Sequence, residues 1–215
     1  DLLKEFPFSH IFNCAGTYSD EVARFFGIAN NLKMLPFKGV YWELDKDSEI
    51  EFNTNLYPVP DLNVPFLGVH VTPSINGEIF LGPTAIPAFG RENYKWIENI
   101  EFIKTLQFSQ ILTSQFLKNE NGFRKYAIEQ GLHGFKNFFF KSAKKLIPDL
   151  KINDLILSKK VGIRPQLFNT SSRKLNQDFL IENYQNTTHI LNAISPAFTA
   201  SFEFADLIID RSSMR

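Results

Sequence analysis

The stretch HIFNCAGTYSDEVARFFG, residues 10–27, combines a buried strand, a tight turn and a short helix in immediate succession. The apolar run that begins at Ile11 is typical of a buried strand. Gly16 tolerates backbone angles that are unfavourable for other residues, so we expect the chain to turn there. Ser19 is a good helix N-cap, and Gly27 is a stop signal. The stretch predicts half of a nucleotide-binding fold, with a purely structural junction as an equal alternative on these residues alone.

The composition of the chain is that of a globular protein with balanced charge. Its 215 residues are 44% hydrophobic, enough to bury a sizeable core in one or two domains. Lys and Arg number 23, as do Asp and Glu, so no overall field attracts nucleic acid. The single cysteine, Cys14, excludes an intrachain disulfide and a multi-cysteine zinc site. Without a secretory segment or an apolar run of roughly 18 residues, a cytoplasmic location is predicted.

The pattern Asn-Cys-Ala-Gly-x-Tyr-Ser-Asp at 13–20 resembles the flavin-domain motif of the D-amino-acid-oxidase-like FAD enzymes. Within that superfamily, the chain is most similar to the L-2-hydroxyglutarate oxidase/dehydrogenase family. Six further blocks carry this resemblance in the right order: LPFKGVYWEL at 35–44, LYPVPDLNVPFLGVHVTP at 56–73, LGPTAIPAFGRENY at 81–94, VGIRPQL at 161–167, DFLIE at 178–182 and HILNAISPAFTAS at 189–201.

The resemblance implies a mixed α/β (α+β) fold, in which part of an FAD-binding Rossmann-like domain is joined to an antiparallel-sheet substrate domain with helices. The expected divisions are a partial FAD-binding domain at 1–34, the substrate-binding domain at 35–160 and a return to the FAD-binding domain at 161–215. The chain lacks the Gly-x-Gly-x-x-Gly turn of a dinucleotide-binding unit. Because the family carries that unit in an N-terminal portion, the resemblance implies that these residues are the C-terminal half and need a separate N-terminal half.

The sequence patterns predict several elements of the middle domain. Alternating side chains predict a strand over 40–44, and a second strand is expected over 50–57. The clearest hairpin joins 66–72 to 79–82 through the Asn-Gly pair at 76–77, which suits a turn with positive φ.

Helical segments are expected from residues 92–93, over 102–117 and over 134–146. In the third segment, Phe and Lys residues fall on opposite faces. Ordinary packing is the favoured interpretation of this amphipathic pattern. A surface that touches lipid headgroups or an electron-accepting partner at the inner membrane is the minority one.

His70 is the candidate catalytic base. The alternation of its strand places it on one face with Gly68 and Thr72, away from the aliphatic residues. An imidazole can take the hydroxyl proton of an alcohol while hydride leaves the adjacent carbon. A hydrogen-bonded histidine on a solvated face is favoured by the strand alone, whereas the resemblance favours the base. The other histidines lie at predicted segment edges and are expected to be structural: His10, His133 and His189.

Arg164, in the block Gly162-Ile163-Arg164-Pro165, resembles the arginine that this superfamily places near flavin and substrate. A guanidinium offers a planar, permanently charged fork to a carboxylate, although an isolated arginine is more often part of a surface ion pair. The resemblance implies substrate contacts from three residues: Arg164, Tyr57 and Thr72. It implies FAD contacts from a larger set: Ala15, Gly16, Gly162, Ile163, Arg164, Ser195, Pro196 and Ala197.

Ser195 and Pro196 form a strong helix start, since an N-cap is followed by proline at the first helical position. We expect a helix over 197–209, whose N-terminal N–H groups present a positive dipole end. If that end faces the flavin pyrimidine edge, as the resemblance implies, it would stabilise the anion formed on reduction. An ordinary capped helix is the alternative.

The function implied by the resemblance is FAD-dependent oxidation of L-2-hydroxyglutarate to 2-oxoglutarate. Two departures from the family pattern affect how the second carboxylate of the substrate would be recognised. Basic residues that often stand in the family near positions 74 and 90 are replaced here by Ser74 and Gly90. A related 2-hydroxy acid, or a 2-amino acid, is therefore an alternative substrate. An inactive fragment or a binding subunit is the competing non-catalytic interpretation.

Overall fold

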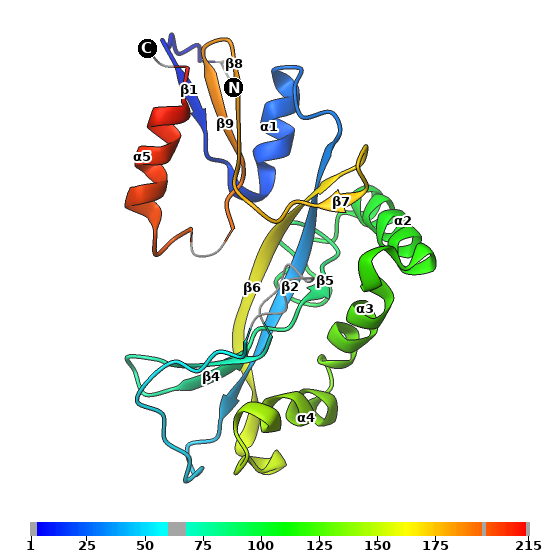
Figure 1. Cartoon of the computed structure of the whole chain (residues 1–215), viewed down its shortest axis with the longest axis vertical. Coiled ribbons are helices and arrows are strands. Elements are labelled where there is room, and N and C mark those ends of the chain that lie inside the picture. The colour runs from blue at the N-terminus through cyan, green and yellow to red at the C-terminus, as the bar shows by residue number, and fades with distance from the viewer. Residues whose placement is uncertain (1–3, 60–67, 195–196, 214–215) are drawn as a thin grey trace. The chain divides into compact units, whose positions relative to one another are not determined.

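The structure, a computed structural model, describes three stretches of the chain: residues 4–59, 68–194 and 197–213. They form two compact units (Figure 1). The terminal unit comprises residues 1–35 and 165–215, and the central unit comprises residues 36–164. Helices and sheets occur in both, which confirms the predicted mixed α/β class.

The terminal unit contains a three-stranded sheet in the order β1-β9-β8. Its strands are β1 (Ile11–Asn13), β8 (Leu180–Tyr184) and β9 (Thr187–Asn192). β1 is parallel to β9, and β8 is antiparallel to β9. β1 and β9 are far apart in the sequence, and sequence order does not show which strands are neighbours. Their parallel pairing is therefore known only from the structure.

The helices of the terminal unit are η1 (Gly16–Tyr18), α1 (Ser19–Phe25) and α5 (Ser201–Arg211). Gly16 has φ +57° and Gly27 has φ +79°, which confirms the turn and the helix stop predicted there. Ser19 is not the N-cap that we predicted. A 3₁₀ turn precedes α1, so Ser19 is already helical, and its hydroxyl donates to the carbonyl of Leu191 at 3.3 Å.

The predicted start of the last helix is wrong. α5 begins at Ser201, with Ala200 as its N-cap, and residues 197–200 form turns. The N–H of Ala197 donates to the carbonyl of Ile194 at 2.8 Å, an i to i+3 pattern. A Ser-Pro pair favours turns as well as helix starts, which explains the difference. The predicted site residues Ser195 and Pro196 themselves lie outside the described residues.

The central unit is built on an antiparallel arrangement with the strand order β3-β4-β2-β6, and β5 pairs with β2. Its strands are β2 (Leu32–Leu44), β3 (His70–Pro73), β4 (Ile79–Gly82), β5 (Ile86–Pro87) and β6 (Leu155–Asn169). β2 and β6 both run into the terminal unit, where the short β7 (Lys174–Leu175) pairs with the end of β6. The predicted hairpin is confirmed in β3 and β4, and Gly77 in its turn has φ +91°.

The strand predicted over 50–57 is wrong. Only one isolated bridge forms in this stretch, between Leu56 and Val71. Pro58 follows at once and has no N–H to extend the pairing. The first residues of the strand predicted over 66–72 lie outside the described residues.

Three helices follow the hairpin: α2 (Phe102–Lys118), α3 (Phe123–Leu132) and α4 (Lys136–Leu146). Short 3₁₀ turns occur at η2 (Glu120–Gly122) and η3 (Ile152–Asp154). The helices predicted over 102–117 and 134–146 are confirmed. α3 was not predicted, and none of its residues is fully buried, so its sequence carries little periodic signal.

No helix forms at residues 92–93, so that prediction is wrong. The side chain of Asn93 explains why: its amide donates to the carbonyls of Lys95 and Glu98, each at 2.7 Å, and its oxygen accepts from the N–H of Phe89. Asn93 is fully buried. An asparagine that satisfies loop backbone groups in this way stabilises a loop in place of a helix.

One face of the central sheet packs on α4. Val71, Leu81 and Trp42 form a row across three adjacent strands and belong to one buried cluster with Phe139 and Ala143 of α4. Figure 1 places α2, α3 and α4 on the same side of β2 and β6. The buried side of α4 is narrower than predicted, because other phenylalanines of the expected stripe are partly exposed: Phe135 and Phe138. The alternate residues of the strands face away from this core.

Candidate active site

The turn after β1 is held by the side chain of Asn13. Its amide nitrogen donates to the carbonyl of Ser19 at 2.8 Å and to Nδ1 of His189 at 3.0 Å, and its oxygen accepts from the N–H of Ala15. Asn13 is almost fully buried. One side chain therefore ties together the end of β1, the turn, the start of α1 and strand β9.

His189 lies inside β9 and not at a segment edge as we predicted. Its Nδ1 accepts from Asn13, so Nε2 carries the proton and donates to Oγ1 of Thr187 at 2.8 Å. Burial lowers the pKa of His189, which keeps the ring neutral. The residue is hydrogen-bonded on both nitrogens, and this agrees with the structural role predicted for it.

A cavity of about 250 Å³ opens beside this turn within the terminal unit. Its lining includes Cys14 and Gly16, which follow β1, and Asn192 and Ala193 at the end of β9. The carboxyl ends of parallel strands are where α/β folds bind nucleotides. Pockets for whole ligands usually measure about 300–1,000 Å³, so this cavity fits part of a dinucleotide. Of the predicted FAD contacts, Gly16 lines it, Ala15 lies in the adjoining turn, and Ala197 is not among its lining residues.

In the central unit, His70 lies on the sheet face opposite the α4 core. Val71 points into that core, so its neighbours His70 and Thr72 point the other way. His70 pairs with Gly82 on β4, and Thr72 pairs with Phe80. Gly82 has no side chain, and the Tyr41 ring and the Val40 carbonyl come within 3.3 Å and 3.1 Å of the place where a Cβ would stand.

Several aromatic rings lie on this face of the sheet, and one of them contacts His70. The ring of Tyr57 stacks on the imidazole, with centroids 4.9 Å apart. Tyr41 is close enough to Tyr57 for the two phenols to interact, and this interaction adds to burial in raising the pKa of Tyr41. Tyr41 also meets Phe80 edge to face at 6.3 Å. The structure thus brings together two predicted site residues, Tyr57 and His70, with two aromatic residues that were not predicted.

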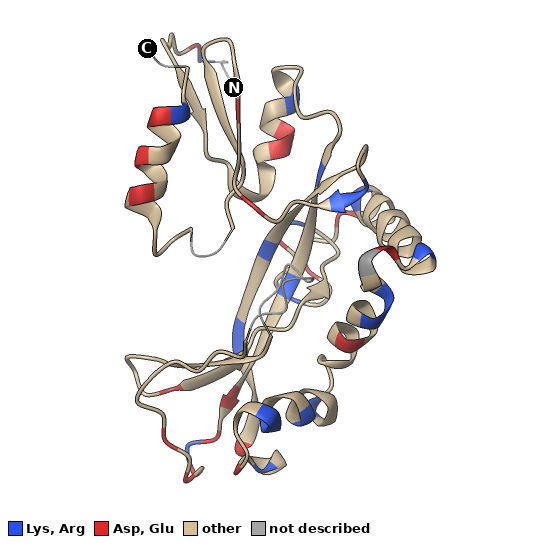
Figure 2. Ribbon diagram, viewed as in Figure 1, with Lys and Arg blue, Asp and Glu red and all other residues tan. Residues whose placement is uncertain are grey.

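Lys160 on β6 completes this group. Its ammonium lies 4.3 Å from the ring centroid of Phe80 and 5.0 Å from that of Tyr41. Figure 2 shows basic residues along β6. Tyr41, Tyr57, His70, Phe80 and Lys160 are hereafter called the sheet-face cluster.

The surroundings of His70 favour the neutral imidazole. Burial lowers the pKa of His70, the hydrogen bond to the Gly68 carbonyl raises it in part, and the charge of Lys160 lowers it further. A carbonyl only accepts, so Nδ1, 3.2 Å from Gly68 O, carries the ring proton. The lone pair is then on Nε2, which can accept a proton.

Arg164 is half-buried on β6, and burial lowers the pKa of Arg164 while Tyr126 opposes that change. His70 and Arg164 lie on β3 and β6, which β4 and β2 separate. Three strand spacings amount to about 14 Å. The structure therefore does not bring Arg164 into contact with His70. Gly162 and Ile163 share this part of β6 within the central unit, and open space lies beside Gly162.

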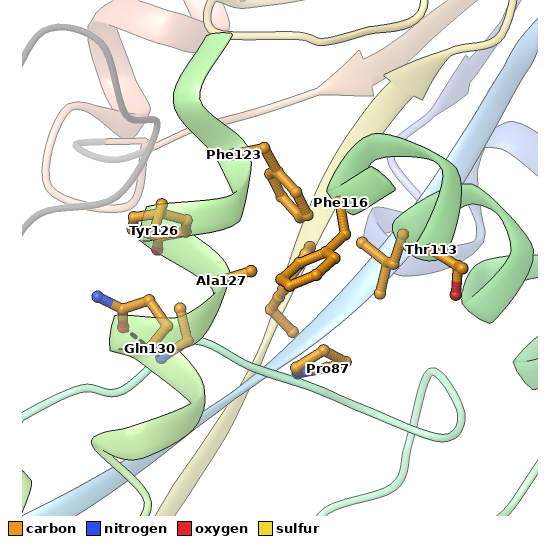
Figure 3. Close-up of a pocket in the computed structure, with 10 residues that line it drawn as sticks. Pro87, Thr113, Phe116, Phe123, Tyr126, Ala127 and Gln130 are labelled. Carbon is orange, nitrogen blue, oxygen red and sulfur yellow. Dashed lines mark hydrogen bonds between the residues drawn. The ribbon is translucent and has the colours of Figure 1, made fainter. Parts of the chain in front are cut away.

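A second cavity, of about 370 Å³, lies between α2, α3 and the strands β2 and β5 (Figure 3). Phe116 and Phe123 face it from the two helices, and Tyr126 and Gln130 supply its polar edge. Gln130 accepts a hydrogen bond from the N–H of Ala85. Burial raises the pKa of Tyr126 above its usual range, with Arg164 opposing the shift. This cavity was not predicted, because its lining comes from segments that are far apart in the sequence.

Two further findings concern the described residues as a whole. Within residues 4–59, 68–194 and 197–213, no three His, Cys, Asp or Glu side chains gather in a way that would hold a metal ion. None of the helices in these stretches combines the length and the apolar character needed to cross a bilayer.

The fold and these sites define a class: a mixed α/β protein with a nucleotide-type strand–turn–helix unit and a separate antiparallel sheet that carries a histidine. A family model described as FAD dependent oxidoreductase matches residues 4–211. The chain belongs to this family of FAD-dependent oxidoreductases, as its sequence motifs predicted.

The chain is similar to several dehydrogenases. It is 37% identical over 207 residues to the L-2-hydroxyglutarate dehydrogenase of Indibacter alkaliphilus, a match that covers 93% of this chain and 49% of that protein. It is 32% identical over 218 residues to the mitochondrial L-2-hydroxyglutarate dehydrogenase of Homo sapiens, covering 99% of this chain and 46% of the relative. The chain thus spans about half the length of these relatives.

A solved structure shares the fold. It is a dithionite-reduced L-α-glycerophosphate oxidase from Mycoplasma pneumoniae with FAD bound, which aligns with a TM-score of 0.56 at 18% identity. The alignment covers 93% of this chain and 41% of the oxidase.

Proposed function

We propose that this chain forms the substrate side, and part of the flavin site, of an enzyme that oxidises L-2-hydroxyglutarate to 2-oxoglutarate. The observation that carries the proposal is His70, whose imidazole stacks on Tyr57, holds its proton on Nδ1 and has a pKa lowered by burial and by the charge of Lys160. The names of the similar dehydrogenases support the substrate. FAD, when bound, would accept hydride from the carbon that carries the hydroxyl group.

The residues that would hold the flavin are those around the terminal unit's cavity. Gly16 brings backbone without a side chain to the cavity, and Asn192, whose amide nitrogen donates to the carbonyl of Asp178, also lines it. We also propose, from the motifs, contacts from a second set: Ala15, Gly162, Ile163, Arg164, Ser195, Pro196 and Ala197.

His70 acts as the general base in this proposal. Nδ1 donates to the Gly68 carbonyl, which fixes the tautomer and directs the Nε2 lone pair to the substrate hydroxyl. The proton passes from the hydroxyl group to Nε2 as the carbonyl forms. Tyr57 holds the ring plane by stacking, and Thr72, on the same face, would contact the substrate.

Arg164 would bind the carboxylate next to the reacting carbon. The chemistry of arginine supports this role, since the guanidinium stays charged even where burial lowers its pKa. A substrate that meets both His70 and Arg164 must lie over the intervening strands.

Two partners belong to this proposal. An N-terminal portion carries the glycine-rich phosphate-binding turn that this chain lacks, in keeping with its coverage of about half of the relatives. A membrane-associated electron acceptor at the cytoplasmic side of the inner membrane would contact α4, where Phe135 and Phe138 are 65% and 42% exposed close to lysines. The full-length enzyme should float with anionic liposomes, and a Lys141→Glu/Lys145→Glu variant should float less; no flotation would reject this partner.

The function is tested with the full-length enzyme under anaerobic conditions. L-2-hydroxyglutarate should bleach the flavin absorbance and yield one 2-oxoglutarate for each flavin that is reduced. D-2-hydroxyglutarate should do neither. Faster bleaching by an L-2-amino acid would favour an amino-acid oxidase. A purified protein without flavin absorbance would favour the non-catalytic interpretation.

A further inference from the structure

Lys160 has surroundings that are unusual for a surface lysine. Its side chain is exposed, and among the described residues no carboxylate lies within 4 Å of its ammonium. Two aromatic rings hold the ammonium instead, those of Phe80 and Tyr41. Cation–π contacts fix the position of a charge without neutralising it. The ammonium therefore remains available to an anion.

The path of the side chain is informative. Lys160 belongs to β6, but Phe80 belongs to β4, and β2 lies between these strands. The lysine ammonium therefore meets the ring of a residue two strands away and, at the same time, the Tyr41 ring of the strand between them. His70 lies on β3, directly beside β4, and the charge of Lys160 reaches it. The candidate base and a cation thus face one area of the sheet.

The two positions where the resemblance led us to expect basic residues have other roles here. The hydroxyl of Ser74 accepts from the N–H of Asn76 at 3.2 Å and so helps to form the hairpin turn. Gly90 packs against the backbone carbonyl of Asn99 so closely that a Cβ would collide with it. Position 90 therefore cannot carry a lysine without a change in this loop.

We propose that Lys160 binds the carboxylate of the substrate that is farther from the reacting carbon, and so sets a preference for 2-hydroxy dicarboxylic acids. This inference rests on the proposed function. The ammonium exchanges bound water for a carboxylate oxygen, and its three N–H donors form charge-assisted hydrogen bonds. The cation expected near positions 74 and 90 is thus supplied from a different strand.

Kinetics with a matched pair of substrates test the inference. L-2-hydroxyglutarate and L-2-hydroxyvalerate both have five carbons, but only the first has a distal carboxylate. In the full-length enzyme, Lys160→Met should lower the preference for the dicarboxylate, expressed as the ratio of the two kcat/KM values, by about 10- to 100-fold. Lys160→Arg should restore most of the preference. Lys159→Met removes the neighbouring exposed charge and should keep the parent ratio.

A ratio for Lys160→Met within about threefold of the parent would overturn the inference, as would an equal loss in Lys159→Met.

Titration with glutarate, which is not oxidised, tests the carboxylate site independently of whether the proposed function is correct. If the parent oxidises neither 2-hydroxy acid, the proposed function fails. Glutarate binding that is lost in Lys160→Met and kept in Lys159→Met would still support the carboxylate site. Parent protein that binds no glutarate, or a Lys160→Met variant that binds it unchanged, would reject the site.

Discussion

The rings of Tyr57 and His70 stack with their centroids 4.9 Å apart and their planes inclined by 28°. Tyr57 lies on an irregular segment held to β3 by the bridge between Leu56 and Val71, and His70 lies on β3 itself. The stack covers one side of the imidazole, while the Gly68 carbonyl holds Nδ1. Only Nε2 remains for a substrate, which makes the orientation of the ring part of the proposed mechanism.

Removal of the base should reduce turnover much more than binding. We expect His70→Gln to lower kcat by about 100-fold or more, since general-base catalysis contributes roughly that factor. Glutarate affinity should stay within a few-fold of the parent. His10→Gln is the control, because His10 forms one hydrogen bond to Thr188 in the terminal unit. A turnover rate for His70→Gln close to the parent rate would reject His70 as the base.

Loss of the stacked ring should change the pKa of His70. Burial is the largest cause of its lowered pKa. Tyr57→Ala exposes the imidazole, so the pKa should rise toward its ordinary value, and the acidic limb of the kcat/KM profile should move to higher pH. Tyr57→Phe retains the ring and should leave the limb unchanged. Equal shifts in both variants would show that the phenol oxygen, and not burial by the ring, sets the pKa.

Loss of the charge on Lys160 should also shift this profile. The ammonium lowers the pKa of His70 because a nearby positive charge disfavours the imidazolium ion. In Lys160→Met the pKa of His70 should rise. The base then becomes protonated at a higher pH than in the parent, and activity is lost at that higher pH. Lys160→Arg should leave the acidic limb of the kcat/KM profile unchanged. Raising the ionic strength should shift the parent profile in the same direction as Lys160→Met, since salt screens exposed charges.

Local sequence patterns predicted those elements in which one signal dominates. The Asn-Gly turn at 76–77 and the helix over 102–117 are examples, and both are observed. Predictions failed where a local signal is compatible with more than one backbone conformation. Asn93 stabilises a loop in place of a helix, and the segment before α5 forms turns although Ser-Pro is a good helix start.

The candidate site was predictable only in part for a related reason. Alternation along one strand placed His70 on the open face correctly, because that inference needs no partner strand. Lys160 carries no such signal, since its role depends on the order β4-β2-β6 and on contacts with aromatic rings from two other strands. The separation of Arg164 from His70 by two strands likewise follows from sheet order, which spacing in the sequence does not contain.

The flavin contact proposed for Gly16 can be tested by a matched pair of glycine substitutions. Gly16 and Gly77 both have positive φ and open space where a Cβ would stand, but only Gly16 lines the cavity beside β1 and β9. Because φ is +57° at Gly16 and +91° at Gly77, Gly77→Ala introduces at least as much backbone strain as Gly16→Ala. We expect the flavin content of the purified full-length enzyme to fall in Gly16→Ala and to stay at the parent level in Gly77→Ala. Equal flavin content in the two variants would remove Gly16 from the proposed site.

The buried carboxylate of Asp20 should be important for the stability of the terminal unit. Asp20 is fully buried, and it accepts from Nη1 of Arg24 at 3.0 Å and from the N–H of Met34 at 3.3 Å. It thus ties α1 to the first part of β2. Asp20→Ala removes the acceptor of both donors, and breaking a buried ion pair costs about 3–5 kcal/mol. Because the Arg24 side chain is 26% exposed, we expect the lower part of that range.

Urea denaturation of the full-length enzyme measures the free energy of unfolding that is lost in Asp20→Ala. Hydrogen exchange of the native enzyme, at the amides of α1 and β2, shows where the loss occurs. Exchange in these two elements should become faster in Asp20→Ala. Lys33→Ala is the control, since Lys33 is a half-buried charge on β2 that forms no ion pair within the described part of the chain. Its free energy of unfolding should change by less than about 0.5 kcal/mol. Equal destabilisation by the two variants would mean that the stability lost in Asp20→Ala reflects a general sensitivity of this region, and not the ion pair between Asp20 and Arg24.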